Sequence, residues 1–185
     1  FSHISEVLEA LSDGALILED ERYASRALDA IETYYKIPTQ EWPPPARRSW
    51  RCHLSIPNSS ALLGVALDYC SGFWSAGEIE FVSDRITGDL LPRFLETWRK
   101  QDEFWARPGY HFNWKIVCCA DSGLGALACG ESVPDLPEVL EAALAGVLDV
   151  LDTMPTEGDW PEGPAYHLVS LASGLRFGLA LKNAT

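Results

Sequence analysis

Apolar residues recur every three or four positions in four segments of the chain, which is the spacing of one face of an α-helix. The pattern predicts helices over residues 4–11, 21–35, 87–105 and 135–152. Ser2 fits the N-terminal cap of the first helix, and Gly14 fits its stop signal. Prolines 134 and 155 bound the last helix, which is the clearest of the four.

Other segments alternate between apolar and polar positions or are continuously apolar, as half-buried or buried strands are. Strands are predicted over residues 50–56, 77–82, 110–119, 124–129, 166–172 and 175–181, whereas residues 62–69 fit either a strand or a helix. Asp121-Ser122-Gly123 and Ser173-Gly174 are turn signals, each expected to close a hairpin. The Pro-rich residues 42–45 favour an extended connection.

These elements predict a single α+β domain over residues 1–185, with a mostly antiparallel sheet and helices packed on one face. Composition agrees with a folded core, because 47% of the 185 residues are apolar and seven are Trp. No apolar run reaches the 18 residues that a membrane-spanning helix needs, so no membrane partner is expected.

The charge balance narrows the possible partners. The chain has 14 Lys and Arg against 27 Asp and Glu, a net charge of −13. Direct binding to nucleic acid needs a cationic surface, and so does binding to anionic lipid. The balance therefore argues against both and favours a basic protein partner.

The cysteines indicate a reducing compartment. Five cysteines, an odd number, do not form a typical disulfide framework of a secreted protein: Cys52, Cys70, Cys118, Cys119 and Cys129. We expect reduced thiols that are mostly buried as small apolar side chains. The expected location is the cytoplasm.

No motif of catalysis or cofactor binding is convincing. Residues 123–128 match the dinucleotide pattern G-x-G-x-x-A, but Pro134 follows too closely for the crossover helix, so a hairpin turn is predicted there. The cysteines lack the paired spacing of zinc ligands. His111 and Cys119 would lie about 26 Å apart on one strand, too far for a nucleophilic pair. We therefore predict no enzyme activity, no cofactor, no metal and no catalytic residue.

Acidic residues form a stripe on the helix predicted over 135–152. Glu138, Glu141, Asp149 and Asp152 fall on one side of that helix, and residues 116–175 contain no Lys or Arg to balance them. A solvated face usually mixes both signs of charge, which favours a surface directed at a basic partner, although a merely solvated face remains an alternative. The predicted partner-binding residues are Glu138, Glu141, Asp149, Asp152, Glu157, Asp159 and Trp160. Trp160 is either the aromatic anchor of that interface or a side chain packed under the Pro-rich loop.

The chain resembles the bacterial immunity proteins that neutralise polymorphic toxins, including effectors delivered by type VI secretion. It is most similar to the family paired with restriction-endonuclease-fold toxins, through residues 72–77 (Gly-Phe-Trp-Ser-Ala-Gly) and 175–178 (Leu-Arg-Phe-Gly). The resemblance implies a non-enzymatic inhibitor that binds a cognate toxin, with a basic nuclease domain as the expected partner.

Two other functions remain open. One is a small-ligand protein or enzyme with a pocket lined by Trp74, Trp98, Trp105 and Trp114, and with His111 or His167 as its polar group. The other is an adaptor subunit whose acidity serves solubility alone.

Overall fold

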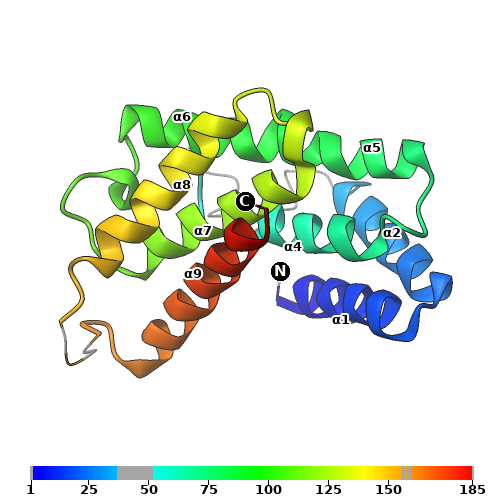
Figure 1. The fold of residues 1–185 in the computed structure, drawn as a ribbon, viewed down its shortest axis with the longest axis horizontal. Helices are drawn as coiled ribbons and strands as arrows, with labels where there is room; N and C mark the ends of the chain where they lie inside the picture. Colours follow the sequence, from blue (N-terminus) through cyan, green and yellow to red (C-terminus); the bar gives the residue numbers. More distant parts are fainter. Residues whose placement is uncertain (1, 37–51, 156, 158–159, 185) are drawn as a thin grey trace.

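The computed structural model describes residues 2–36, 52–155, 157 and 160–184, and all regular structure in this part of the chain is helical (Figure 1). The predicted α+β fold with a mostly antiparallel sheet is therefore wrong. The helices are α1 (Ser2–Leu18), α2 (Glu21–Lys36), α4 (Ser55–Cys70), α5 (Ala76–Arg85), α6 (Leu91–Lys100), α7 (Asn113–Cys129), α8 (Leu136–Leu151) and α9 (Pro164–Ala184). A π-helical turn (Ile86–Leu90) joins α5 to α6, and short 3-10 turns occur at Phe104–Ala106 and Gly130–Ser132.

Helix α7 is the centre of the molecule, and α4, α8 and α9 pack around it (Figure 1). Thirteen of its 17 residues are buried. The α1–α2 pair packs on α4, while α5 and α6 form a nearly continuous rod on another side. A helix surrounded in this way has no polar face, so its apolar residues do not recur every three or four positions. For this reason the segment was predicted as two strands joined by a turn.

Glycines in α7 allow this close packing. A Cβ atom at Gly125 would lie 2.0 Å from Ser60 Oγ on α4, and one at Gly123 would lie 2.4 Å from the Phe177 ring on α9. The G-x-G sequence is therefore a helix-packing motif in the middle of α7. It is neither the predicted hairpin turn nor the helix N-terminus that a dinucleotide needs.

Three further strand predictions, for residues 77–82, 166–172 and 175–181, are wrong. Ser75 caps α5, because its hydroxyl accepts from the backbone N–H of Glu78 while the Glu78 carboxylate accepts from the Ser75 backbone N–H at 2.7 Å. This capping box starts a helix where alternation suggested a strand. Ser173 and Gly174 lie within α9, and Gly174 faces Ile116 of α7. The expected hairpin is a single helix.

The amphipathic segments were predicted correctly as helices. Helix α2 begins at Glu21, as expected, and α8 fills most of 135–152. Helix α6 is shorter than predicted, and α1 continues beyond Gly14, where a Cβ atom would lie 2.8 Å from the ring of Tyr23. Residues 55–56 of the predicted strand 50–56 begin α4. The extended connection predicted at 42–45 lies outside the described residues.

The core combines aromatic and thiol side chains. Phe94 and Trp105 stack with centroids 6.1 Å apart, and Trp105 Nε1 donates to the Cys52 carbonyl at 2.9 Å. All five cysteines are buried, as predicted, and all are free thiols. Among the described helices, none combines the length and apolar character needed to cross a lipid bilayer.

Candidate functional site

Helix α8 carries the predicted acidic stripe. Its buried side packs on α7 through small and branched apolar residues, namely Val139, Ala142, Ala143, Gly146, Val147 and Val150. Gly146 permits a close approach, since a Cβ atom there would lie 2.2 Å from Cys119 Sγ. This packing fixes which residues of α8 face outward.

Two of the four acids on α8 have basic partners from distant parts of the chain. Glu138 accepts two hydrogen bonds from the Arg99 guanidinium on α6, one of them from Nε at 2.6 Å. These bonds lower the pKa of Glu138. The absence of a neighbouring cation in the sequence therefore did not mean an unpaired carboxylate.

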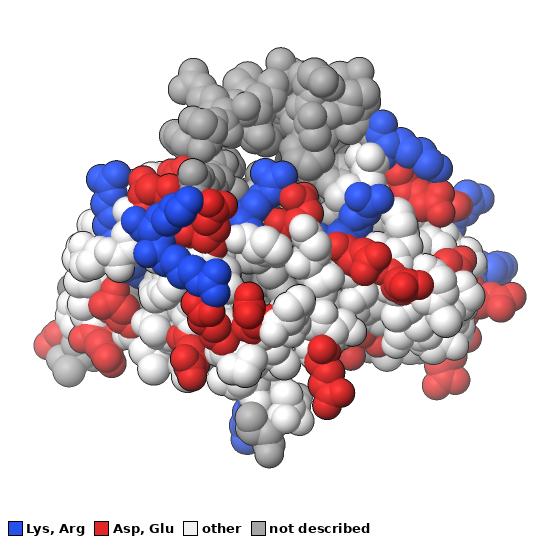
Figure 2. Space-filling model, turned by 90° about the horizontal axis from the view of Figure 1, so that it is seen from above, with Lys and Arg blue, Asp and Glu red and all other residues white. Residues whose placement is uncertain are grey.

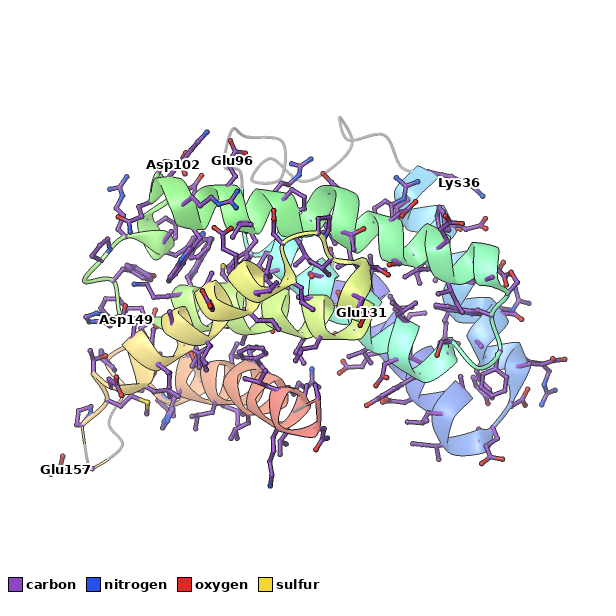
Figure 3. All side chains as sticks on the ribbon, turned by 45° about the horizontal axis from the view of Figure 1, so that its top comes forward. Lys36, Glu96, Asp102, Glu131, Asp149 and Glu157 are labelled. Carbon is purple, nitrogen blue, oxygen red and sulfur yellow. The ribbon has the colours of Figure 1, made fainter. Side chains whose placement is uncertain are left out.

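Asp149, near the C-terminal end of α8 (Figure 3), has a structural role. Lys115 Nζ on α7 donates to Asp149 Oδ2 at 2.7 Å and to the Arg107 carbonyl at 2.9 Å, and the Lys115 side chain is only 2% exposed. His111 Nε2 lies 3.4 Å from the other carboxylate oxygen. The hydrogen bond from Lys115 is the main reason that the pKa of Asp149 is lowered. The carboxylate therefore neutralises a buried ammonium group.

The other two acids, Glu141 and Asp152, are exposed, and in the described part of the chain neither forms an ion pair. Beside them lie Leu144, Leu148 and Leu151, which are 39%, 45% and 36% exposed. These leucines therefore belong to the exposed side of α8, together with the two acids. We call Glu141, Leu144, Leu148, Leu151 and Asp152 the α8 surface.

The remaining predicted site residues are separate from the α8 surface. Glu157 is exposed and points away from the helices (Figure 3), and Asp159 lies outside the residues that the structure describes. Trp160 is 8% exposed and stacks on His167, with centroids 5.6 Å apart. Its Nε1 donates to the Glu162 carboxylate, which also accepts from the Asn113 backbone N–H at the start of α7. In this conformation Trp160 is a packing residue and is not offered to a partner.

Acidic side chains are also widespread elsewhere. Basic and acidic side chains interleave over the upper part of the face in Figure 2, and acidic ones predominate over its lower part. A negative potential therefore extends over more than α8.

A second candidate site is a groove between α1 and α9, with α4 and α7 as its floor. It has two adjoining parts of about 380 and about 560 Å³, which share Glu9, Val65, Leu124 and Arg176. Arg176 Nη2 donates to Glu9 Oε1 at 2.7 Å and links the two walls where the parts meet. This groove does not follow from the predicted elements, because the segments that form α7 and α9 were predicted as hairpins.

Asp121 lies in the smaller part of the groove and is 8% exposed. With the amide of Asn58 oriented so that its nitrogen faces Asp121, it donates to Asp121 Oδ2 at 2.9 Å, and the Ser173 hydroxyl also donates to this carboxylate. Burial raises the pKa of Asp121 to about 7, although the hydrogen bond from Ser173 and the charge of Arg176 oppose the rise. A perturbed acid in a cleft marks a candidate binding site.

The cysteine thiols and the potential metal ligands give little support for a catalytic or metal site in the described part of the chain. Burial raises the pKa of the Cys52, Cys118 and Cys119 thiols, which keeps them protonated at neutral pH. Across the described residues, no three His, Cys, Asp or Glu side chains are grouped to hold a metal ion.

The tryptophans proposed to line a pocket serve mainly as core residues. Trp98 and Trp105 both stack on Phe94, Trp74 Nε1 donates to the Ala24 carbonyl at 3.0 Å, and Trp114 packs against Phe104. Neither part of the groove is lined by any of the four.

Comparisons with protein-family models, curated proteins and solved structures find no significant match, so geometry and charge are the basis for assigning a function.

Proposed function

We propose that this protein is a non-enzymatic binding protein that captures a basic partner protein on the α8 surface. The observation that carries the proposal is the pairing of an exposed leucine stripe with two acids that lack an ion-pair partner among the described residues. The three leucines are spaced i, i+4 and i+7, so they form one continuous strip along the helix.

This combination is typical of an interface and serves stability poorly. Protein interfaces have an apolar centre that excludes water and a charged rim that orients the partner. Asp152 is the C-terminal cap of α8, where the helix dipole disfavours a negative charge. The Asp152 carboxylate therefore does not stabilise the helix, and it forms no ion pair with the described residues. It does add to the negative electrostatic potential beside the three leucines.

The partner that fits the charge is cationic. With a net charge of −13, the whole molecule attracts basic proteins and speeds their encounter with the α8 surface. The resemblance to immunity proteins suggests a toxin, and a nuclease domain is basic because it binds phosphates. On this proposal the protein works in the cytoplasm as a stoichiometric inhibitor that covers the nuclease cleft.

The leucine stripe gives the first test. We would purify the protein encoded beside this gene and measure its Kd for the wild-type protein and for Leu148→Ser/Leu151→Ser. Truncation of two interface leucines should weaken binding at least about tenfold. The matched control is Leu168→Ser/Leu175→Ser, because these leucines of α9 are 71% and 62% exposed and lie off the α8 surface.

The control variant should bind within about twofold of wild type. Equal weakening by both variants would move the interface away from α8. A neighbouring gene product that is not basic, or that forms no complex with the wild-type protein, would argue against the toxin-inhibitor function.

A further inference from the structure

The groove between α1 and α9 follows the axis of α7. Asn113, Val117, Asp121 and Leu124 recur along one face of α7 and line its floor, and Ala128 continues the line into the larger part. From Asn113 to Ala128 this floor is about 22 Å long. An extended ligand therefore fits the groove better than a compact one.

Two residues that line this groove, Asn113 and Asp121, carry hydrogen-bond acceptors without a full set of donors. Asn113 is 6% exposed, lines the smaller part, and its Oδ1 has no hydrogen-bond partner among the described residues. Asp121 accepts from Asn58 and Ser173, but an ionised carboxylate has about four acceptor positions. Asn113 Oδ1 is itself buried, so the free acceptor positions of Asp121 are the ones that a ligand with N–H donors would satisfy in the groove.

Acids continue along the larger part of the groove. Asp13 of α1 and Asp68 of α4 line it, and both are exposed. The basic residue Arg176 is already paired with Glu9. The local charge therefore favours a cation over an anion.

The acceptors are too far apart for a single cationic group. Asp121 lies eight residues after Asn113, about 12 Å along α7. Asp68 lies ten residues after Asn58, the partner of Asp121, which is about 15 Å along α4. Between them the walls are aliphatic, with Leu62, Val65 and Leu124.

We propose that the groove binds a linear polyamine, whose ammonium groups donate to Asp121 and Asp68 while its methylene runs lie against Val65 and Leu124. A chain with alternating ammonium and methylene segments matches the alternation of acceptors and aliphatic walls. A tetraamine spans the distance between the two acids, whereas a diamine reaches only one of them. This site is separate from the α8 surface and goes beyond the protein-binding function proposed above.

The environment of Asp121 adds a pH dependence to this site. The charged groups that face it are Arg176 from α9 and Glu9 from α1, while α4 presents the neutral Asn58. Because the pKa of Asp121 is raised to about 7, its carboxylate form becomes dominant only above neutral pH. An ammonium group that binds the carboxylate should therefore bind about tenfold more tightly at pH 8 than at pH 6.

Calorimetric titration with spermine at physiological salt tests the proposal. We expect saturable binding at one site, with putrescine at least about tenfold weaker because it contacts one acid. Asp121→Asn and Asp68→Asn should each weaken spermine binding at least about tenfold. Asp68 is exposed, so its variant keeps the test valid if Asp121→Asn fails to fold.

A control separates this site from general attraction to an acidic protein. Glu80→Gln/Asp84→Asn removes two exposed charges from α5, away from the groove, and should leave spermine affinity within about twofold. Mg²⁺ should not compete at equal charge concentration. Absent or unsaturable spermine binding, or an equal loss in the α5 variant, would overturn the proposal.

Discussion

Asp121→Asn should change how the stability of the protein depends on pH. Asn has nearly the same shape as Asp but does not ionise, so the variant removes one titration and keeps the packing. Asp121 is well suited to this test because it is 8% exposed and burial dominates its pKa shift.

The sign of the effect follows from the direction of that shift. The pKa of Asp121 is about 7 in the folded protein, against about 3.9 for an unfolded chain. Between these values the folded state holds the proton and the unfolded state does not, so the free energy of unfolding falls as pH rises. From pH 5 to pH 8 this one group should remove about 2 to 3 kcal/mol of stability from the wild-type protein.

Urea denaturation at pH 5, 6.5 and 8 measures the difference in unfolding free energy between wild type and Asp121→Asn. This difference should shift by about 2 to 3 kcal/mol in favour of the variant as pH rises. Asp13→Asn, an exposed acid of the same groove, is the control and should give a difference constant within about 0.5 kcal/mol. A constant difference for Asp121→Asn as well would refute the reasoning from burial.

Three further predictions concern packing, the buried ion pair and the thiols. Gly125→Ala should lower the free energy of unfolding by about 2 kcal/mol or more, because its Cβ would clash with Ser60. Gly77→Ala is the control, because nothing lies near this position of α5, and it should raise the free energy of unfolding by up to about 1 kcal/mol. Thermal unfolding of the two variants measures the difference. Asp149→Ala should cost about 2 kcal/mol in urea denaturation by leaving buried Lys115 without its carboxylate, while Asp152→Ala should change stability by less than about 0.5 kcal/mol. The five buried thiols should react with a thiol reagent only as fast as the protein opens, so rapid labelling of the native protein would contradict their burial.

Prediction from sequence worked where a helix lies at the surface. The segments that became α2 and α8 have one polar and one apolar face, and their apolar period is visible in the sequence. It failed in α7, because a helix buried on nearly all sides is apolar all round. Small residues such as Gly123 and Gly125 indicated a turn locally, but their actual role depends on Phe177 and Ser60, which are distant in the sequence.

One local signal was present and was overlooked. Ser75 and Glu78 have the spacing of a capping box, which marks a helix start more specifically than short alternation marks a strand. Recognition of this pair would have corrected the residues 77–82 to a helix.

The candidate site was predictable only in part. The acids of α8 were correctly placed on one side of a helix, but their partners Arg99 and Lys115 come from α6 and α7. Such ion pairs depend on tertiary packing and leave no local pattern. The groove at Asp121 was equally invisible, because its walls are the first and last helices of the chain.

The most direct test of the α8 surface is the association rate with the proposed basic partner, sought as the product of the neighbouring gene, at low and high salt. Glu141→Lys/Asp152→Lys should slow association about tenfold or more at low salt, and the difference should shrink as salt screens the charges. Glu80→Lys/Asp84→Lys on α5 makes the same change in net charge, so it should slow association much less if the acids beside the leucines guide the partner. Equal slowing by the two variants, or rates that neither variant changes, would contradict capture of a basic partner on α8.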